Sequence, residues 1–149
     1  MFKIPFKDQK EMEMFMKSST KSLYILADRF SKFKYSIHPF LVSNSLRLKL
    51  KQWSLSARSV NQFLTKWLQN EHNSPLEHLS IDIDQSVYIP HVLEGLGAVP
   101  FLEEREFHYS KQLDIPPKTI HGGYDIREMN GKEVTIRYGF YRIDFYVWP

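Results

Sequence analysis

The sequence contains no cysteine in its 149 residues. Disulfide bonds, thiolate zinc sites and cysteine nucleophiles are therefore excluded, and we expect a cytoplasmic or nuclear protein. No segment approaches the roughly 20 consecutive apolar residues that a membrane-spanning helix needs. The N-terminus is charged within its first residues and lacks the apolar region of a secretory signal. We therefore expect no membrane partner.

Sequence motifs of catalysis and of cofactor binding are also missing. The chain has no P-loop, no G-x-S-x-G motif and no dinucleotide fingerprint. Its 6 histidines form no pair at positions i and i+4, and zinc needs several converging ligands, so we expect no metal site. Gly122 and Gly123 precede a strand rather than a helix, and a close approach of two chain segments explains them better than a phosphate-binding loop. We expect no catalytic residue, no cofactor and no enzymatic activity.

The chain does contain many aromatic residues and an uneven distribution of charge. Hydrophobic residues make up 42% and aromatic residues 15%, which is typical of a folded protein. Residues 1–70 carry 13 Lys/Arg against 4 Asp/Glu, whereas residues 71–149 carry 7 against 13. A basic half can bind nucleic acid, so a nucleic-acid-binding domain that uses the N-terminal half is our alternative function. Because the basic residues are dispersed, we favour pairing between the two halves over a nucleic-acid partner.

A strand–helix–strand pattern spans residues 46–83. Leu48 and Leu50 alternate with charged residues at its start, and Leu79 and Ile81 alternate with polar residues at its end. Two strands joined by a helix need a parallel sheet and a crossover. Between them, apolar residues recur at the helical spacing that is typical of a core-facing stripe. This stripe consists of Val60, Phe63, Leu64, Trp67 and Leu68.

The C-terminal residues 121–149 predict a three-stranded antiparallel meander. Their β-branched and aromatic residues favour strands, and Asn130 with Gly131 is a strong hairpin signal. Residues 84–121 are less regular. The sequence thus predicts one α/β domain over residues 1–149, with α+β character at the C-terminus. A small repeat-like strand–helix–strand layer, whose LEHLSI segment is similar to leucine-rich repeats, leads into the meander.

Two segments together resemble the type 2 F-box-associated domain of nematode F-box proteins. The first is the strand–helix–strand pattern, and the second is the tail, in which residues 122–127, 131, 134–136 and 146–148 match the closing segment of that family. The matching residues of the first segment are Trp53, Val60, Asn61, Phe63, Leu64, Trp67, Asn73, Leu76, Glu77, Leu79, Ser80 and Ile81.

This resemblance implies a non-enzymatic protein–protein interaction module. In the F-box family, the F-box docks on a Skp-type adaptor and the associated domain holds the target for an SCF-type ubiquitin ligase, so that the module recognises substrates for ubiquitination. We find no F-box segment in the sequence. The Skp-type adaptor is therefore expected as a partner only if an F-box exists upstream, and the target protein is unidentified.

The two strands of the first segment provide one set of candidate partner-binding residues. Arg47 and Lys49 lie on the polar side of one strand, and Asp82 and Asp84 lie on that of the other. If the strands are neighbours in register, Lys49 faces Asp82 and Lys51 faces Asp84. These residues either pair across the strands or form the surface that binds the target.

The aromatic meander provides the second set of candidates. Exposed tyrosine and tryptophan are favoured at protein interfaces, and alternation along each strand places some of them outward. Together with Arg127, Arg137 and Arg142, these aromatic residues could instead stack on the bases of a nucleic acid. The candidate residues are Tyr124, Arg127, Tyr141 and Tyr146.

Overall fold

The structure, a computed structural model, describes residues 2–3, 10, 14, 21–26, 43–51, 55–69, 75–82, 87–127, 131–139 and 141–149. Trp53, Asn73 and Asp84 lie outside these residues. In the described part of the chain, no helix has the length and apolar character needed to cross a membrane.

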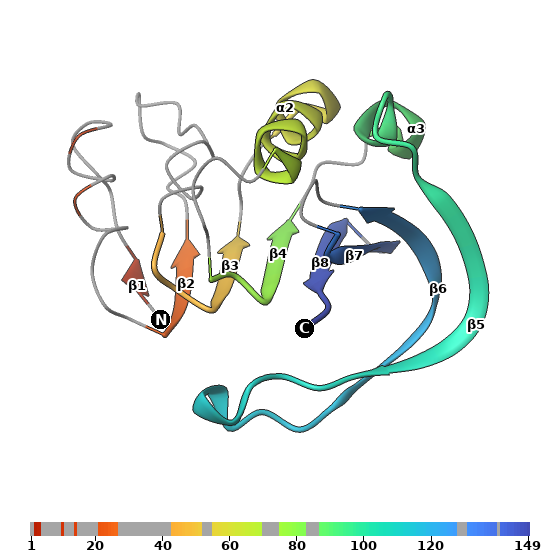
Figure 1. Cartoon of the computed structure of the whole chain (residues 1–149). Helices are drawn as coiled ribbons and strands as arrows, with labels where there is room; N and C mark the ends of the chain where they lie inside the picture. The colour runs from red at the N-terminus through yellow and green to blue at the C-terminus, as the bar shows by residue number, and fades with distance from the viewer. Residues whose placement is uncertain are drawn as a thin grey trace.

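A single mixed sheet runs through the described residues (Figure 1). Its eight strands are β1 (Phe2–Lys3), β2 (Ser22–Leu26), β3 (Arg47–Lys51), β4 (His78–Asp82), β5 (Val99–Phe107), β6 (Lys118–Arg127), β7 (Glu133–Gly139) and β8 (Arg142–Val147). Their order in the sheet is β1-β2-β3-β4-β8-β7-β6-β5. The first four strands are parallel, and every pairing from β4 onward is antiparallel. The parallel strands and the C-terminal strands are thus parts of one sheet, joined where β4 meets β8.

The predicted mixture of helix and sheet is present. Residues 84–121 are expected from the sequence to be less regular, but the described residues 87–121 consist largely of regular elements. These residues contain the helix α3 (Ile89–Leu93), the nine-residue strand β5 and the start of β6. The run of glutamates in β5 has low strand propensity, and pairing with β6 overrides it.

Helix α2 (Ala57–Leu68) covers one face of the sheet, beside α3 (Figure 1). The Ser56 side chain caps it by accepting a hydrogen bond from the Ser59 backbone amide. All five residues of the predicted stripe are buried in the core between helix and sheet, so this prediction is confirmed. Asn61 ties the two helices together, because its side-chain amide donates to the carbonyl oxygens of Val92 and Glu94 at 2.8 Å each.

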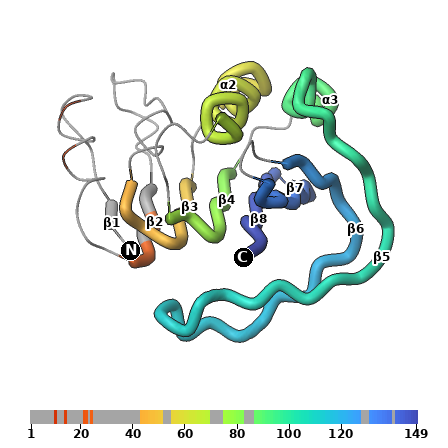
Figure 2. Tube along the Cα trace, in the orientation of Figure 1, coloured from red at the N-terminus to blue at the C-terminus, as the bar shows by residue number. Residues whose placement is uncertain are grey.

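The opposite face of the sheet is crossed by a hairpin, which we call the arm and define as residues 101–121. Its strands β5 and β6 leave the sheet and fold back beneath it, as the course of the chain in Figure 2 shows. The arm ends in a short 3₁₀ turn at Lys111–Leu113. A second apolar cluster lies between arm and sheet, where the Phe107 ring is 5.1 Å from the rings of both Tyr146 and Trp148.

Two glycines allow the arm to bend. Gly122 and Gly123 have φ angles of +73° and +152°, and the pairing of β5 with β6 shifts register opposite them, between Phe101 and Glu104. A Cβ atom at Gly123 would stand 2.7 Å from the carbonyl oxygen of Ile136 in β7. The prediction that these glycines mark a close approach of chain segments is therefore confirmed.

Replacing Trp67 by alanine tests the helical core. Trp67 is 5% exposed, so Trp67→Ala is expected to lower the free energy of unfolding by roughly 3–5 kcal/mol in a chemical melt. The exposed neighbour Lys66→Ala is the control and is expected to change it by about 0.5 kcal/mol or less. A loss below about 1 kcal/mol for Trp67→Ala would contradict its place in the core.

Replacing Gly123 by alanine tests the bend. Gly123→Ala is expected to cost about 2 kcal/mol or more, because the new Cβ meets backbone and the residue must hold a positive φ. Gly139→Ala, in the neighbouring strand, is the matched control, since nothing lies within 4 Å of an added Cβ there. Equal unfolding free energies for the two variants would show that the bend does not need glycine.

Candidate functional site

Polar side chains follow the face of the sheet that the arm crosses. One row runs from Arg47 to His78 and Tyr146, and the next runs from Lys49 through Ser80 to Asp144. Alternate residues of the same strands point to the helices and are apolar. At the centre of the sheet, the arm-facing side therefore carries ionisable groups, whereas the helix-facing side carries apolar ones.

The observed register corrects one prediction. Lys49 lies opposite Ser80, not Asp82, because Leu48 pairs with Leu79. A shift of two residues keeps every side chain on its predicted face, so the hydrophobic pattern alone does not distinguish the two registers. The predicted pair of Lys51 and Asp84 lies outside the described residues.

A chain of hydrogen bonds crosses this face at its most buried point. The Nε2 of His78 lies 2.8 Å from Oδ1 of Asp144, and the Nε of Arg142 donates to the other oxygen of Asp144 at 3.0 Å. The Nε of Arg47 donates to Nδ1 of His78 at 3.2 Å. Since Nδ1 accepts, Nε2 carries the proton and donates it to Asp144. Both ring nitrogens are engaged, so neither is available to act as a general base in this arrangement.

Burial sets the protonation of this pair. Burial lowers the pKa of His78 below its ordinary value of 6.5, against the opposing influence of Asp144. Burial also acts to raise the pKa of Asp144, but hydrogen bonds from His78 and Ser80 and the charge of Arg142 outweigh it and lower that pKa. His78 is thus neutral and Asp144 ionised near pH 7.

Two aromatic rings, one from β8 and one from the arm, hold His78 in place. The rings of His78 and Tyr146 are parallel within 4° and 4.6 Å apart, and the ring of Tyr109, from the arm, meets His78 edge-on at 5.7 Å. The Arg47 guanidinium lies 5.5 Å above the Tyr109 ring. The amide of Ser110 donates to a carboxylate oxygen of Glu77 at 2.7 Å, which fastens the tip of the arm to the start of β4.

Tyr146 is therefore not part of an exposed surface, and the prediction that it is available to a partner is wrong. It is 2% exposed, sealed between His78 and Phe107. Burial raises its pKa, so the phenol stays protonated. Alternation along β8 places Tyr146 on the correct face, but the arm that covers this face is distant in sequence.

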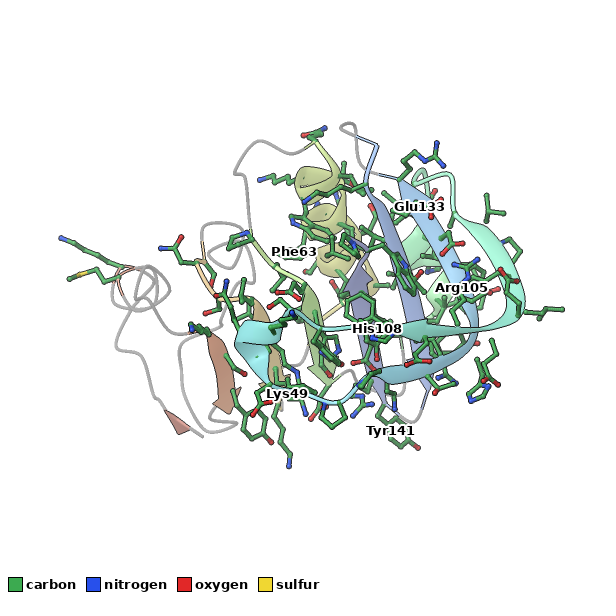
Figure 3. The ribbon with its side chains drawn as sticks, turned by 60° about the horizontal axis from the view of Figure 1, so that its bottom comes forward. Lys49, Phe63, Arg105, His108, Glu133 and Tyr141 are labelled. Carbon is green, nitrogen blue, oxygen red and sulfur yellow. The ribbon has the colours of Figure 1, made fainter. Side chains whose placement is uncertain are left out.

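Beside the arm, where β4 ends and β8 begins, the surface forms an open depression of about 440 Å³. Its lining includes Asp82, Lys118, Arg137, Tyr138, Arg142 and Asp144. Tyr141 lies at this end of the sheet, and both Tyr138 and Tyr141 are more than half exposed, at 54% and 53%. Figure 3 shows Lys49 and Tyr141 in the lower part of the view, at the opposite end from Glu133.

The remaining predicted residues lie elsewhere. Tyr124 is half-buried against the core under the helices, and exposed Arg127 pairs with Glu133 at 3.2 Å, away from the depression. Arg47 is half-buried beneath the arm. Of the predicted residues, the structure brings only Asp82, Lys49, Tyr141 and buried Tyr146 close to the depression.

The sequence did not predict Lys118 as a site residue, the grouping of Lys118 with Arg137 and Arg142, or the buried His78–Asp144 pair. The signal for part of it is the alternation in β8, where Arg142, Asp144 and Tyr146 share one face. Lys118 carries no such signal, because it comes from the arm and reaches the depression only through the fold. Among the described residues, no three His, Asp or Glu side chains are grouped so as to hold a metal ion.

Residues 10–81 match the sequence model of a protein family described as F-box associated. The match covers just under half of the chain and includes β2, β3, α2 and β4, the part that supplies Lys49 and His78. Residues 10–81 are thus similar to an F-box-associated region. The predicted resemblance to the F-box-associated family is confirmed for the strand–helix–strand segment, whereas the tail lies outside the matched residues. Among curated proteins and among solved structures, nothing matches the chain.

The buried histidine of the matched region predicts a pH dependence of stability. A base whose pKa is lowered on folding contributes fully above its unfolded value of 6.5, and the contribution is lost as the pH falls through that value. Asp144 adds a similar loss only below its unfolded value of 3.8. His78→Gln keeps a donor and an acceptor but does not titrate. The difference in unfolding free energy between wild type and His78→Gln is expected to shrink from about pH 7.5 to about pH 5.5.

Urea unfolding at several pH values measures this difference. The control is the exposed Lys66→Gln on α2, which leaves the His78–Asp144 pair in place, and its difference from wild type is expected to stay constant. A constant difference for His78→Gln as well would show that His78 is not held neutral.

Proposed function

We propose that this chain is a non-enzymatic protein-interaction module that selects target proteins for an SCF-type ubiquitin ligase. The F-box-associated match of residues 10–81 carries the proposal. In that family, the associated domain holds the target while the F-box docks on a Skp-type adaptor. The adaptor is thus a partner where an F-box is present on the same polypeptide, and the lack of cysteine supports a cytoplasmic or nuclear location.

Two features of the site support binding over catalysis. The histidine and the aspartate at its centre use their polar atoms on each other and on Arg47 and Arg142, which suits a fixed scaffold. The exposed residues at the depression include Tyr138, Tyr141 and Arg142, and tyrosine and arginine contribute strongly to protein–protein binding energy. The surface formed by Tyr138, Tyr141, Arg137 and Arg142 is our candidate for contact with the target.

A capture experiment tests this role. The tagged chain is incubated with nuclease-treated cell extract, and bound proteins are quantified by mass spectrometry. The wild type is expected to enrich a defined set of proteins, and Tyr138→Ser combined with Tyr141→Ser is expected to weaken that enrichment about tenfold. Tyr88→Ser, also exposed but beside α3, is the matched control and is expected to leave the enrichment unchanged.

The ligase role is tested with the same proteins. Joined to an F-box and assembled with a Skp-type adaptor, the chain is expected to direct ubiquitination of the captured proteins in a reconstituted reaction. Capture without ubiquitination would contradict the ligase role and leave the interaction role standing. Retention on nucleic acid that falls steeply with the logarithm of salt concentration would instead favour a nucleic-acid-binding domain.

A further inference from the structure

Basic side chains from four separate strands gather at the depression. Lys118 comes from β6, Arg137 from β7 and Arg142 from β8, and all three line it. Lys49 of β3 lies in the row that crosses Ser80 and Asp144 to reach Arg137. The fold therefore concentrates positive charge from residues that are as far apart as positions 49 and 142.

The carboxylates of the depression neutralise only part of this charge, because Asp144 pairs with Arg142 and leaves Lys118 and Arg137 without a carboxylate partner among the described residues. Asp144 already uses one oxygen on His78 and the other on Arg142. Among the described residues, neither Lys118 nor Arg137 forms an ion pair, and Asp82 lies opposite Arg142 in the sheet. Four basic groups thus stand against two acidic ones. Burial lowers the pKa of Lys49, and repulsion from Arg47 and Arg142 lowers it further, against the attraction of Asp144 and Asp82.

The shape and the chemistry of the depression fit one class of ligand. Small-molecule sites are enclosed and mostly apolar, whereas this one is open and lined by charged groups. A nucleic-acid backbone needs a continuous basic track, but here Asp82 interrupts the basic residues. Separate carboxylates on a peptide can reach the individual basic groups, and exposed Tyr138 and Tyr141 provide rings for its apolar atoms.

We propose that the depression formed by Lys118, Arg137 and Arg142, with Lys49 beside it, binds an acidic segment of the target protein. This inference rests on the protein-interaction role proposed above and adds the charge of the partner. Arg137 and Lys118 meet the acidic side chains first, since neither is engaged by a carboxylate of the described chain. Asp144 holds the Arg142 side chain by its Nε atom, which leaves the terminal nitrogens of the guanidinium to the partner.

A binding assay with a defined probe tests the inference on the full chain. The probe is a short fluorescein-labelled peptide in which glutamate alternates with glycine, and anisotropy reports its binding. A peptide with glutamine in place of glutamate and a single-stranded DNA of the same net charge are compared with it. Wild type is expected to bind the glutamate peptide, and Lys118→Gln combined with Arg137→Gln is expected to weaken this binding about tenfold.

The matched control removes one lysine and one arginine elsewhere. Lys66→Gln combined with Arg127→Gln changes the net charge equally, on α2 and at the far end of β6, and is expected to weaken binding by less than about twofold. Arg137→Lys, which keeps the charge, is expected to retain binding within about threefold of wild type. Chemical unfolding of each variant shows that it is folded.

Four results would overturn the inference. These are no binding of the glutamate peptide by wild type, equal binding of the glutamine peptide, equal weakening in the control variant, and tighter binding of the DNA that the depression variant abolishes. The last would make nucleic acid the occupant. If the captured proteins of the preceding section bind the depression variant as well as wild type, the acidic-segment inference fails alone. If no protein is captured while the glutamate peptide binds, the substrate-selection role fails alone.

Discussion

The hydrogen bond between His78 and Asp144 lies where the two halves of the sheet meet. Its two residues belong to β4, the last of the parallel strands, and to β8, which begins the antiparallel part. A buried imidazole and a buried carboxylate each cost solvation free energy, and that cost is offset only while the two are bonded and the flanking arginines supply the remaining partners. The junction between the two halves of the sheet is therefore polar, and its hydrogen bonds form only when β4 and β8 are in register.

The buried polar pair at this junction also explains why the arm covers this face of the sheet. The helices cover one face of the sheet, so the face with His78 and Tyr146 needs another cover to exclude water. The arm supplies Phe107 and Tyr109 for this purpose, and the glycine bend lets β5 and β6 turn back over the sheet instead of continuing its plane. At the base of the arm, Asp125 accepts hydrogen bonds from both Arg105 and Thr135. Hydrogen bonds thus attach the arm to the rest of the sheet at both its base and its tip. The basic depression lies beside the arm.

Local patterns in the sequence predict the parts of this structure that local physics decides. The helical spacing from Val60 to Leu68 predicts the buried stripe of α2, and the alternation in β3 and β4 predicts which side chains face the helices. The register of β3 against β4, the strand β5 and the burial of Tyr146 are different, because each depends on a partner strand or on the arm. The candidate site could not be predicted for the same reason, because it depends on strands that are distant in the sequence. Lys118, Arg137 and Arg142 belong to three strands that only the fold brings together.

The order of strands has a consequence for how the chain reaches this fold. Strand β8 follows the other seven in the chain, yet in the sheet it lies between β4 and β7. During synthesis, the parallel strands and the strands from β5 to β7 emerge before β8, which connects them in the sheet. Until β8 is made, β4 and β7 therefore each have an edge with unpaired hydrogen-bonding groups. Contacts between β4 and β8 span 60 residues or more, which predicts a slow closing step in folding. A cell would have to protect those edges until Arg142–Val147 leaves the ribosome and closes the sheet.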